Sequence, residues 1–172
     1  MSGSSYDAAA HDLGHLAERV KRVWRMDESV YEELAADVNA IPQALLVVAV
    51  PSLVVGLGSF SFSGIFGGMA WAIFMWLISS GLVWLVANAL SDESIPYAGL
   101  LRGLGFAYAW FGLVLLRELP LLGWLIQLAA LVLTVASGVY AVRACMHVST
   151  GKAAAVCGIV ILALRLLLKL IF

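Results

Sequence analysis

Charged residues are scarce in this sequence, and most of them lie near its N-terminus. They make up 12% of the 172 residues, about half of the roughly 25% found in soluble domains. Eight of the 11 acidic and four of the 10 basic residues precede residue 41, which leaves nine charges for the other 132 positions. So few charges cannot cover a surface that faces water, and we expect lipid to surround residues 41–172.

The sequence also lacks the patterns of disulfide-stabilised domains and of most membrane enzymes. Its two cysteines, Cys145 and Cys157, have no C-x-x-C spacing, and a mutual disulfide is not expected. The apolar part has no H-E-x-x-H, no G-x-S-x-G and no pair of aspartates. A proton-coupled transporter needs Asp, Glu or His through the bilayer, and the apolar part cannot supply that relay. We therefore expect no enzymatic activity and no cofactor.

Two weaker patterns do not meet the requirements of a ligand site. Gly99, Gly103 and Gly105 lack both a preceding strand and the K-[ST] pair of a phosphate loop. Asp7, His11 and His15 share one helical face, and two histidines at this spacing can bind zinc. An exposed histidine pair is more often ordinary polar surface, so we expect no metal site.

Apolar runs long enough to cross a membrane dominate the rest of the chain. Crossing the hydrocarbon takes about 20 apolar residues, and polar breaks divide the chain into five such runs. The expected spans are 41–60, 66–90, 99–117, 120–143 and 153–172. The sequence thus predicts an all-α, polytopic membrane bundle of five transmembrane helices over residues 41–172, preceded by a short cytoplasmic segment, residues 1–40.

The distribution of lysine and arginine predicts the orientation, because cytoplasmic loops carry an excess of both. A cytoplasmic N-terminus places seven bases inside: Arg19, Lys21, Arg22, Arg25, Arg102, Arg143 and Lys152. It places three outside: Arg117, Arg165 and Lys169. We expect Arg102 at the entry of the third span, with its long side chain reaching the headgroups. Arg117 and Glu118 should close that span, and Pro120 should begin the next one.

Residues 1–40 are predicted to form two short helices, of which the first is amphipathic. Its apolar residues fall on one face at helical spacing, namely Leu13, Leu16, Ala17, Val20, Val23 and Trp24. Basic residues lie beside them, namely Arg19, Lys21, Arg22 and Arg25. Such a helix can lie on anionic lipid, or its apolar face can pack against the chain's own loops. Both alternatives stay open at this point.

Aromatic and small residues in the spans are candidates for contacts between proteins. The second span carries a crowd of large side chains, namely Phe66, Trp71, Phe74, Met75, Trp76 and Trp84. Tryptophan normally gathers at membrane boundaries, whereas Trp76 is expected near mid-span. Small residues such as Gly64 and Gly68 let helices approach closely in lipid. An interface with a partner protein and packing inside one bundle both explain these features.

Residues 98–158, and residues 26–48 before them, resemble the bacterial branch of the Yip family, the Ypt/Rab-interacting membrane proteins. The similarity lies in "LLRGLGFAYAW", in "LPLLGWLIQLAALVLTVASGVYAVRACMHVSTGKAAAVC" and in "MDESVYEELAADVNAIPQALLVV" at 26–48. It implies a five-span helical protein with a cytoplasmic N-terminus, located in the bacterial inner membrane with its C-terminus outside. The Asp-Leu-Tyr-Gly-Pro segment of eukaryotic members is not present.

The expected function is a non-catalytic scaffold or accessory subunit that binds other membrane proteins. Its partners are expected to be membrane lipids and other membrane proteins, either a larger membrane complex or further copies of itself, and no nucleic acid. The candidate contact residues are Arg19, Lys21, Arg22, Arg25, Arg102, Arg143, Lys152, Trp71 and Trp76. The alternative is a small oligomeric channel or transporter. A channel needs a polar lumen, for which the spans offer only Ser79, Ser80, Asn88, Gln127, Thr134 and Ser137.

Overall fold

The computed structural model describes residues 3–57, 62–91, 94–116 and 122–171. Within these ranges the side chains of 3–11, 57, 62–63, 65, 167–168 and 170–171 are not described. The described residues form helices and no strand, so the all-α prediction is confirmed for this part of the chain. The expected hairpin at Arg117, Glu118 and Pro120 lies outside the described residues.

Helices occupy the place of every expected span, with small differences at their ends. The N-terminal segment forms α1 (Gly3–Trp24) and α2 (Ser29–Ala36). The apolar part forms α3 (Ala40–Leu57), α4 (Phe62–Ala89), α5 (Tyr97–Ala107), η1 (Tyr108–Leu116), α6 (Gly123–Met146) and α7 (Thr150–Ile171).

Within the ranges that the structure describes, three helical segments are long and apolar enough to cross a membrane. They are Phe66–Ala89, Tyr97–Leu116 and Gly123–Met146, and a fourth arises if α2 and α3 count as one span broken by a 119° bend. The apolar helices could therefore span a membrane, as expected of a membrane protein, whereas the five-span topology stays a prediction. The bend places α2 across the beginning of α3 instead of in line with it.

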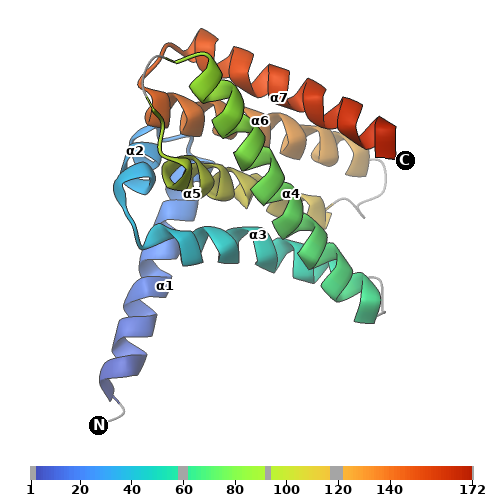
Figure 1. Cartoon of the computed structure of the whole chain (residues 1–172). Helices are drawn as coiled ribbons and strands as arrows, with labels where there is room; N and C mark the ends of the chain where they lie inside the picture. The colour runs from blue at the N-terminus through green and yellow to red at the C-terminus, as the bar shows by residue number, and fades with distance from the viewer. Residues whose placement is uncertain (1–2, 58–61, 92–93, 117–121, 172) are drawn as a thin grey trace.

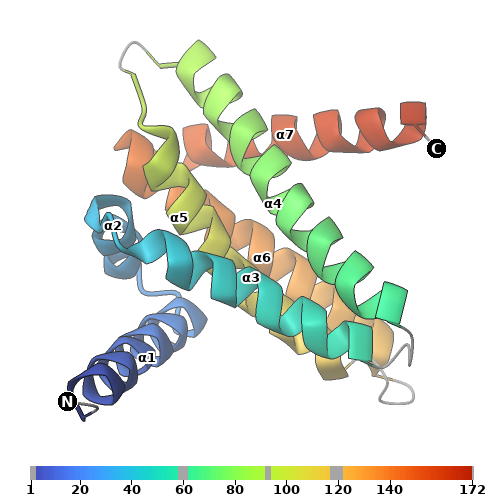
Figure 2. The same cartoon turned by 60° about the horizontal axis from the view of Figure 1, so that its bottom comes forward.

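The centre of the bundle is α5, which contacts α2, α3, α4 and α6 (Figures 1 and 2). Every residue from Gly99 to Ala107 is buried. A Cβ atom added at Gly105 would lie 2.7 Å from the Cβ of Ala44 and 3.0 Å from Cζ2 of Trp76, and one at Gly103 would lie 3.0 Å from the Cβ of Ala141. These glycines therefore allow α3, α4 and α6 to approach α5 closely.

The third apolar segment changes its helix type halfway along. After the α-helical residues of α5, the nine residues of η1 form a 3-10 helix, although 3-10 runs longer than three or four residues are uncommon. A 3-10 helix has three residues per turn, so side chains three positions apart lie in one row. Tyr108, Phe111 and Val114 consequently form a single row along η1.

The N-terminal helices lie together at one end of the bundle. Figure 1 shows α2 beside the beginning of α3, and α1 crossing the direction of α3 with its N-terminal end projecting away from the other helices. The second view shows the same arrangement (Figure 2). Because α1 is 22 residues long, the prediction of two short helices is correct only for α2.

Candidate functional site

Ion pairs connect α1 to α2. The side chain of Arg19 is buried, and it donates to Glu33 Oε1 at 2.8 Å, to Asp37 Oδ2 at 2.6 Å and to Gln43 Oε1 at 2.7 Å. Arg22 contacts Glu33 as well, at 2.5 Å, and its Nε donates to Asp27 Oδ2 at 3.0 Å. Both guanidinium groups therefore face acidic residues of their own chain.

These contacts lower the pKa of three carboxyl groups. Desolvation raises the pKa of Asp37, but hydrogen bonds from Arg19 and Asn39 and the charges of Arg19 and Arg102 outweigh it, so the pKa lies below 3.8. Desolvation likewise raises the pKa of Glu33, and the two arginines bring it below 4.5. The pKa of Asp27 is lowered by a hydrogen bond from Ser29 and then by Arg22. The folded protein thus favours the charged form of each carboxyl group.

The apolar face of α1 packs on the chain itself at its C-terminal end. Val23 is fully buried, Leu16 and Val20 pack against the core, and the indole N–H of Trp24 donates to the carbonyl of Ala109 at 3.3 Å. Of the two alternatives for α1, packing against protein applies here, and lipid contact is wrong for Arg19, whose side chain is buried. Arg22 is only partly buried, so contact of its side chain with lipid stays a prediction.

The remaining exposed residues of α1 leave a lipid contact open. Leu13 is 60% exposed, and Lys21 and Arg25, further along the same segment, are exposed as well. Contact of Lys21 and Arg25 with lipid therefore stays a prediction. Asp7 and His11, two of the three residues considered as metal ligands, lie outside the described side chains.

Arg102 does not reach toward headgroups as the sequence suggested. Its side chain is buried, its Nε donates to the carbonyl of Ala98 at 2.8 Å, and its Nη1 has no hydrogen-bond partner in the described part of the chain. The expectation of a snorkelling Arg102 is therefore wrong. The reason is the bend before α3, which folds α2 over the beginning of α5. This fold brings the carboxylate of Asp37 close enough to Arg102 for the positive charge to lower its pKa.

Two of the other predicted contact residues lie near the end of α6. Arg143 is half-buried, and its Nη1 donates to Glu28 Oε1 at 2.9 Å and lies 2.8 Å from Oε2. Lys152, in the first turn of α7, is exposed. The structure brings Arg143 to the α1–α2 segment but does not bring Lys152 to any described side chain by an ion pair.

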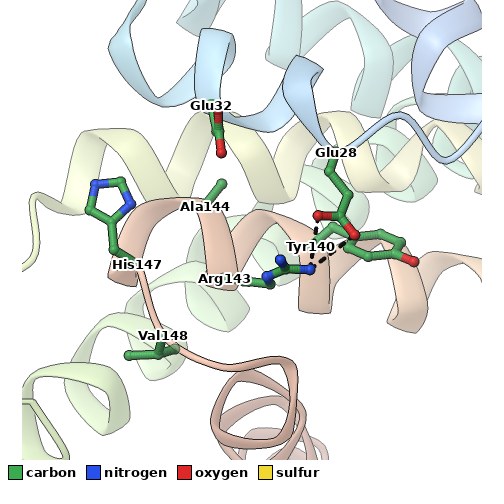
Figure 3. Close-up of a pocket in the computed structure, with 7 residues that line it drawn as sticks. All are labelled: Glu28, Glu32, Tyr140, Arg143, Ala144, His147 and Val148. Carbon is green, nitrogen blue, oxygen red and sulfur yellow. Dashed lines mark hydrogen bonds and ion pairs between the residues drawn. The ribbon is translucent and has the colours of Figure 1, made fainter.

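A small polar pocket surrounds Arg143, where α2 faces the end of α6 (Figure 3). Its volume is about 210 Å³, and its walls are Glu28, Glu32, Tyr140, Arg143, Ala144, His147 and Val148. Figure 3 shows Glu32 above Ala144, and Glu28 above Arg143. His147 ends α6 with a left-handed backbone, φ 50°. Acidic and basic groups therefore line opposite walls of one pocket.

Sequence analysis did not predict this pocket, although the spacing of its residues carries a signal. Glu28 and Glu32 are four residues apart, as are Arg143 and His147, a spacing that favours one helical face for each pair; in the structure Glu28 directly precedes α2 and His147 directly follows α6. What the sequence did not reveal is that these two faces meet. Their meeting depends on the fold of α2 back onto the bundle.

A larger groove runs between α3, α4 and η1. It has a volume of about 1,000 Å³, and most of its lining is apolar or small. The lining includes Ser52, Val55 and Gly56 of α3, Gly64, Gly68, Trp71 and Ala72 of α4, and Tyr108, Phe111 and Val114 of η1. The hydroxyl of Ser52 is already bonded to the carbonyl of Val48 at 2.9 Å, so the groove offers little unsatisfied polarity.

The two candidate tryptophans of α4 have different environments. Trp71 is 48% exposed, lies at the groove and packs at a tilt against Phe74, with ring centroids 5.9 Å apart. Trp76 is 2% exposed, and its indole N–H donates to the carbonyl of Leu101 at 3.0 Å. The prediction of an outer contact is therefore wrong for Trp76, because that face of α4 packs against α5. Burial inside the bundle, the alternative left open above, applies to it.

No family model matches this chain, and neither a curated protein nor a solved structure is significantly similar to it.

Proposed function

We propose that the protein is a non-catalytic scaffold or accessory subunit of a membrane complex, which holds a transmembrane helix of another membrane protein in the groove between α3, α4 and η1. The proposal includes five spans, a cytoplasmic N-terminus, an outside C-terminus and a bacterial inner membrane, as the charge distribution and the resemblance to the Yip family suggest. The groove is the observation that carries it.

The small residues of the groove favour a helix as its occupant. Association in lipid depends on close packing, and small side chains permit it. Gly68 and Ala72 of α4 are one helical turn apart, and Ser52 and Gly56 of α3 repeat this spacing on the facing wall. A Cβ atom at Gly68 would have only the carbonyl oxygen of Ser52 nearby, at 4.0 Å. A second backbone can therefore approach α4 at this point.

The third wall offers the matching ridge. Tyr108, Phe111 and Val114 stand in one row along η1 because of its 3-10 geometry. The groove thus has an apolar ridge opposite small residues, and Trp71 lies exposed at the same groove. Exposed tryptophan is common among the residues that carry the energy of protein interfaces.

The channel alternative has less support. Of the six polar side chains considered for a lumen, Ser80 is fully buried, and four others are bonded to nearby groups: Ser79 Oγ to the carbonyl of Trp76 at 3.0 Å, Asn88 Nδ2 to that of Trp84 at 2.8 Å, Thr134 Oγ1 to that of Ala130 at 2.7 Å, and Ser137 to Tyr31. They serve the packing of the helices in the described bundle. No specific observation favours a pore.

The test compares variants that differ only in whether they fill the groove. Gly68→Leu places a side chain in the groove, whereas Gly67→Leu, one residue earlier on α4, projects into open space outside its lining. Trp71→Ala removes the exposed tryptophan at the groove, and Trp124→Ala removes one that is 67% exposed elsewhere. Each variant is purified from its native membrane in mild detergent, and co-purifying proteins are quantified by mass spectrometry.

We expect a membrane protein that is lost with Gly68→Leu and Trp71→Ala and kept with Gly67→Leu and Trp124→Ala. A photo-crosslinker in place of Phe111 should then join the groove to a transmembrane peptide of that protein. Equal recovery with all four variants, or crosslinks to lipid alone, contradicts the proposal. Ion flux through liposomes that contain only this protein would establish the channel instead.

A further inference from the structure

The pocket between α2 and α6 is built from two levels of facing side chains. At the first level Glu28 is joined to Arg143 by the ion pair described above. At the second level, four positions further along the chain from Glu28 and from Arg143, Glu32 faces the side where His147 lies (Figure 3). Neither Glu32 nor His147 has a hydrogen bond or ion pair within the described part of the chain. The ion pair therefore occupies the acidic side chain of the first level, whereas both side chains of the second level are available to a ligand.

The second level supplies both an acceptor and donors. The carboxylate of Glu32 accepts hydrogen bonds and carries a negative charge, and the imidazole of His147 presents an N–H. Arg143 uses only Nη1 toward Glu28, so its Nε and Nη2 can still donate. The pocket can thus bind a group that has a cation at one end and an anion at the other.

The position of the pocket fixes the order of these groups relative to the membrane. Arg143 lies in the last turn of α6, a candidate span that ends at Met146, and His147 follows that end. The pocket is consequently at the level of the lipid headgroups. Arg143 lies deeper along the span than His147, and Glu28 lies beside Arg143, so Glu32 belongs to the outer level.

We propose that this pocket binds a phosphoethanolamine headgroup of a membrane lipid, with the phosphate on Arg143 and His147 and the primary ammonium on Glu32. In such a lipid the phosphate lies next to the acyl chains and the ammonium lies further out. This order is the same as that of Arg143 and Glu32. The site does not depend on the groove, because it uses other helices and lies toward the other end of α3.

The size of the pocket agrees with a headgroup. Its volume of about 210 Å³ is smaller than the roughly 300–1,000 Å³ of sites for drug-sized ligands. A headgroup of a few heavy atoms fits this space, whereas the acyl chains would remain outside in lipid. Its open side allows entry without movement of α2.

Selectivity follows from the hydrogen bonds that each headgroup can make. A primary ammonium donates three hydrogen bonds, and a quaternary ammonium donates none, so phosphatidylethanolamine should bind better than phosphatidylcholine. Phosphatidylglycerol carries the phosphate without a cation, so its hydroxyl groups can donate to Glu32 but leave the carboxylate without a counter-ion. Loss of one charge-assisted hydrogen bond should weaken binding by about tenfold or more.

The experiment measures lipid binding to the intact purified protein by native mass spectrometry. The lipids share the same acyl chains and carry ethanolamine, N-methyl-, N,N-dimethyl- or N,N,N-trimethylethanolamine, and phosphatidylglycerol is a further arm. We expect affinity to fall along the methyl series, by about tenfold or more between the ethanolamine and the trimethyl lipid. Free phosphoethanolamine, added to delipidated protein, should bind far more weakly than the lipid.

Two variants test the assignment of the residues. Glu32→Gln should abolish the preference for ethanolamine over its trimethyl analogue, and His147→Ala should weaken all the phospholipids. Glu18→Gln, an exposed glutamate of α1 outside the pocket, is the matched control and should change nothing. Equal affinity across the methyl series in the unaltered protein overturns the proposal without any variant. Tightest binding of phosphatidylglycerol overturns the contact between the ammonium and Glu32. Binding of free phosphoethanolamine as tight as that of the lipid overturns a membrane lipid as the source of the headgroup.

Discussion

The indole N–H of Trp76 donates to the carbonyl of Leu101 across the contact between α4 and α5. Trp76 is also within reach of Gly105, where an added Cβ would lie 3.0 Å from Cζ2 of the indole. One aromatic side chain thus fills the space that a glycine leaves and bonds to the backbone of the same helix.

Replacement of Trp76 by alanine should destabilise the fold much more than the same change at Trp71. Loss of a buried tryptophan costs about 3–5 kcal/mol, whereas an exposed site changes the free energy of unfolding by about 0.5 kcal/mol. Unfolding of each variant in detergent, followed by circular dichroism, measures this difference. Similar losses for both variants would contradict the assignment of Trp76 to the core.

Gly105→Ala should destabilise the bundle by about 1–3 kcal/mol, because the new methyl group meets Ala44 at 2.7 Å and overpacks the core. Gly138→Ala is the matched control, since its methyl group would meet only Leu104 Cδ2, at 3.6 Å, an ordinary contact distance. Thermal unfolding in the same detergent compares them. A stabilised Gly105→Ala variant would be incompatible with so close an approach of α3.

Arg19→Ala should lower the free energy of unfolding by about 2 kcal/mol, because it leaves Glu33 and Asp37 with fewer partners. Because both acids are partly exposed, water can replace some of the lost hydrogen bonds, which limits the loss of free energy of unfolding. Arg25→Ala removes an exposed arginine without a described ion pair and should stay within about 0.5 kcal/mol of the original protein. Limited proteolysis between α1 and α2 gives an independent measure, since cleavage should accelerate only with Arg19→Ala.

Acid should weaken the attachment of α1 to α2. The pKa values of Asp27, Glu33 and Asp37 are lower in the folded chain than their ordinary values of 3.8, 4.5 and 3.8. Their contribution to stability is therefore complete above about pH 4.5 and is lost as the pH falls through the lowered values. The melting temperature should fall below that pH, and less steeply in Arg19→Ala. A melting temperature that rises on acidification would show the opposite sign.

The orientation can be tested with single cysteines in a chain whose Cys145 and Cys157 are replaced by serine. A cysteine at position 150 should react with a reagent that enters from the cytoplasm, and one at position 118 with a reagent that stays outside. This pattern follows from the excess of arginine and lysine on the N-terminal side. The reverse pattern would contradict both the orientation and the resemblance to the Yip family.

Helix positions could be predicted from this sequence, because apolar length and polar breaks are local properties. The predicted second span, 66–90, compares with α4 at Phe62–Ala89, and the predicted fourth, 120–143, with α6 at Gly123–Met146. The change of helix type at Tyr108 carries no such local signal. Packing of the neighbouring helices can override local preference, and that packing is not visible in the sequence.

The environments of single side chains were harder to predict than the helices. Arg102 and Arg19 both appeared as free bases, and both are buried because α2 folds back on the bundle. Trp76 and Trp71 look alike in the sequence, and only the contact of α4 with α5 separates them. The pairing of Glu28 with Arg143, 115 residues apart, depends on that same fold of α2.

The 3-10 geometry of η1 also changes how far the third apolar segment reaches. As a pure α-helix, the 20 residues Tyr97–Leu116 would rise about 30 Å. With about 2.0 Å per residue over the nine residues of η1, the same segment rises about 34 Å. This gain is comparable to the difference in hydrocarbon thickness between thin and thick cellular membranes. A shift of residues between the two helix types would therefore match the segment to the thickness of its bilayer without tilting the bundle.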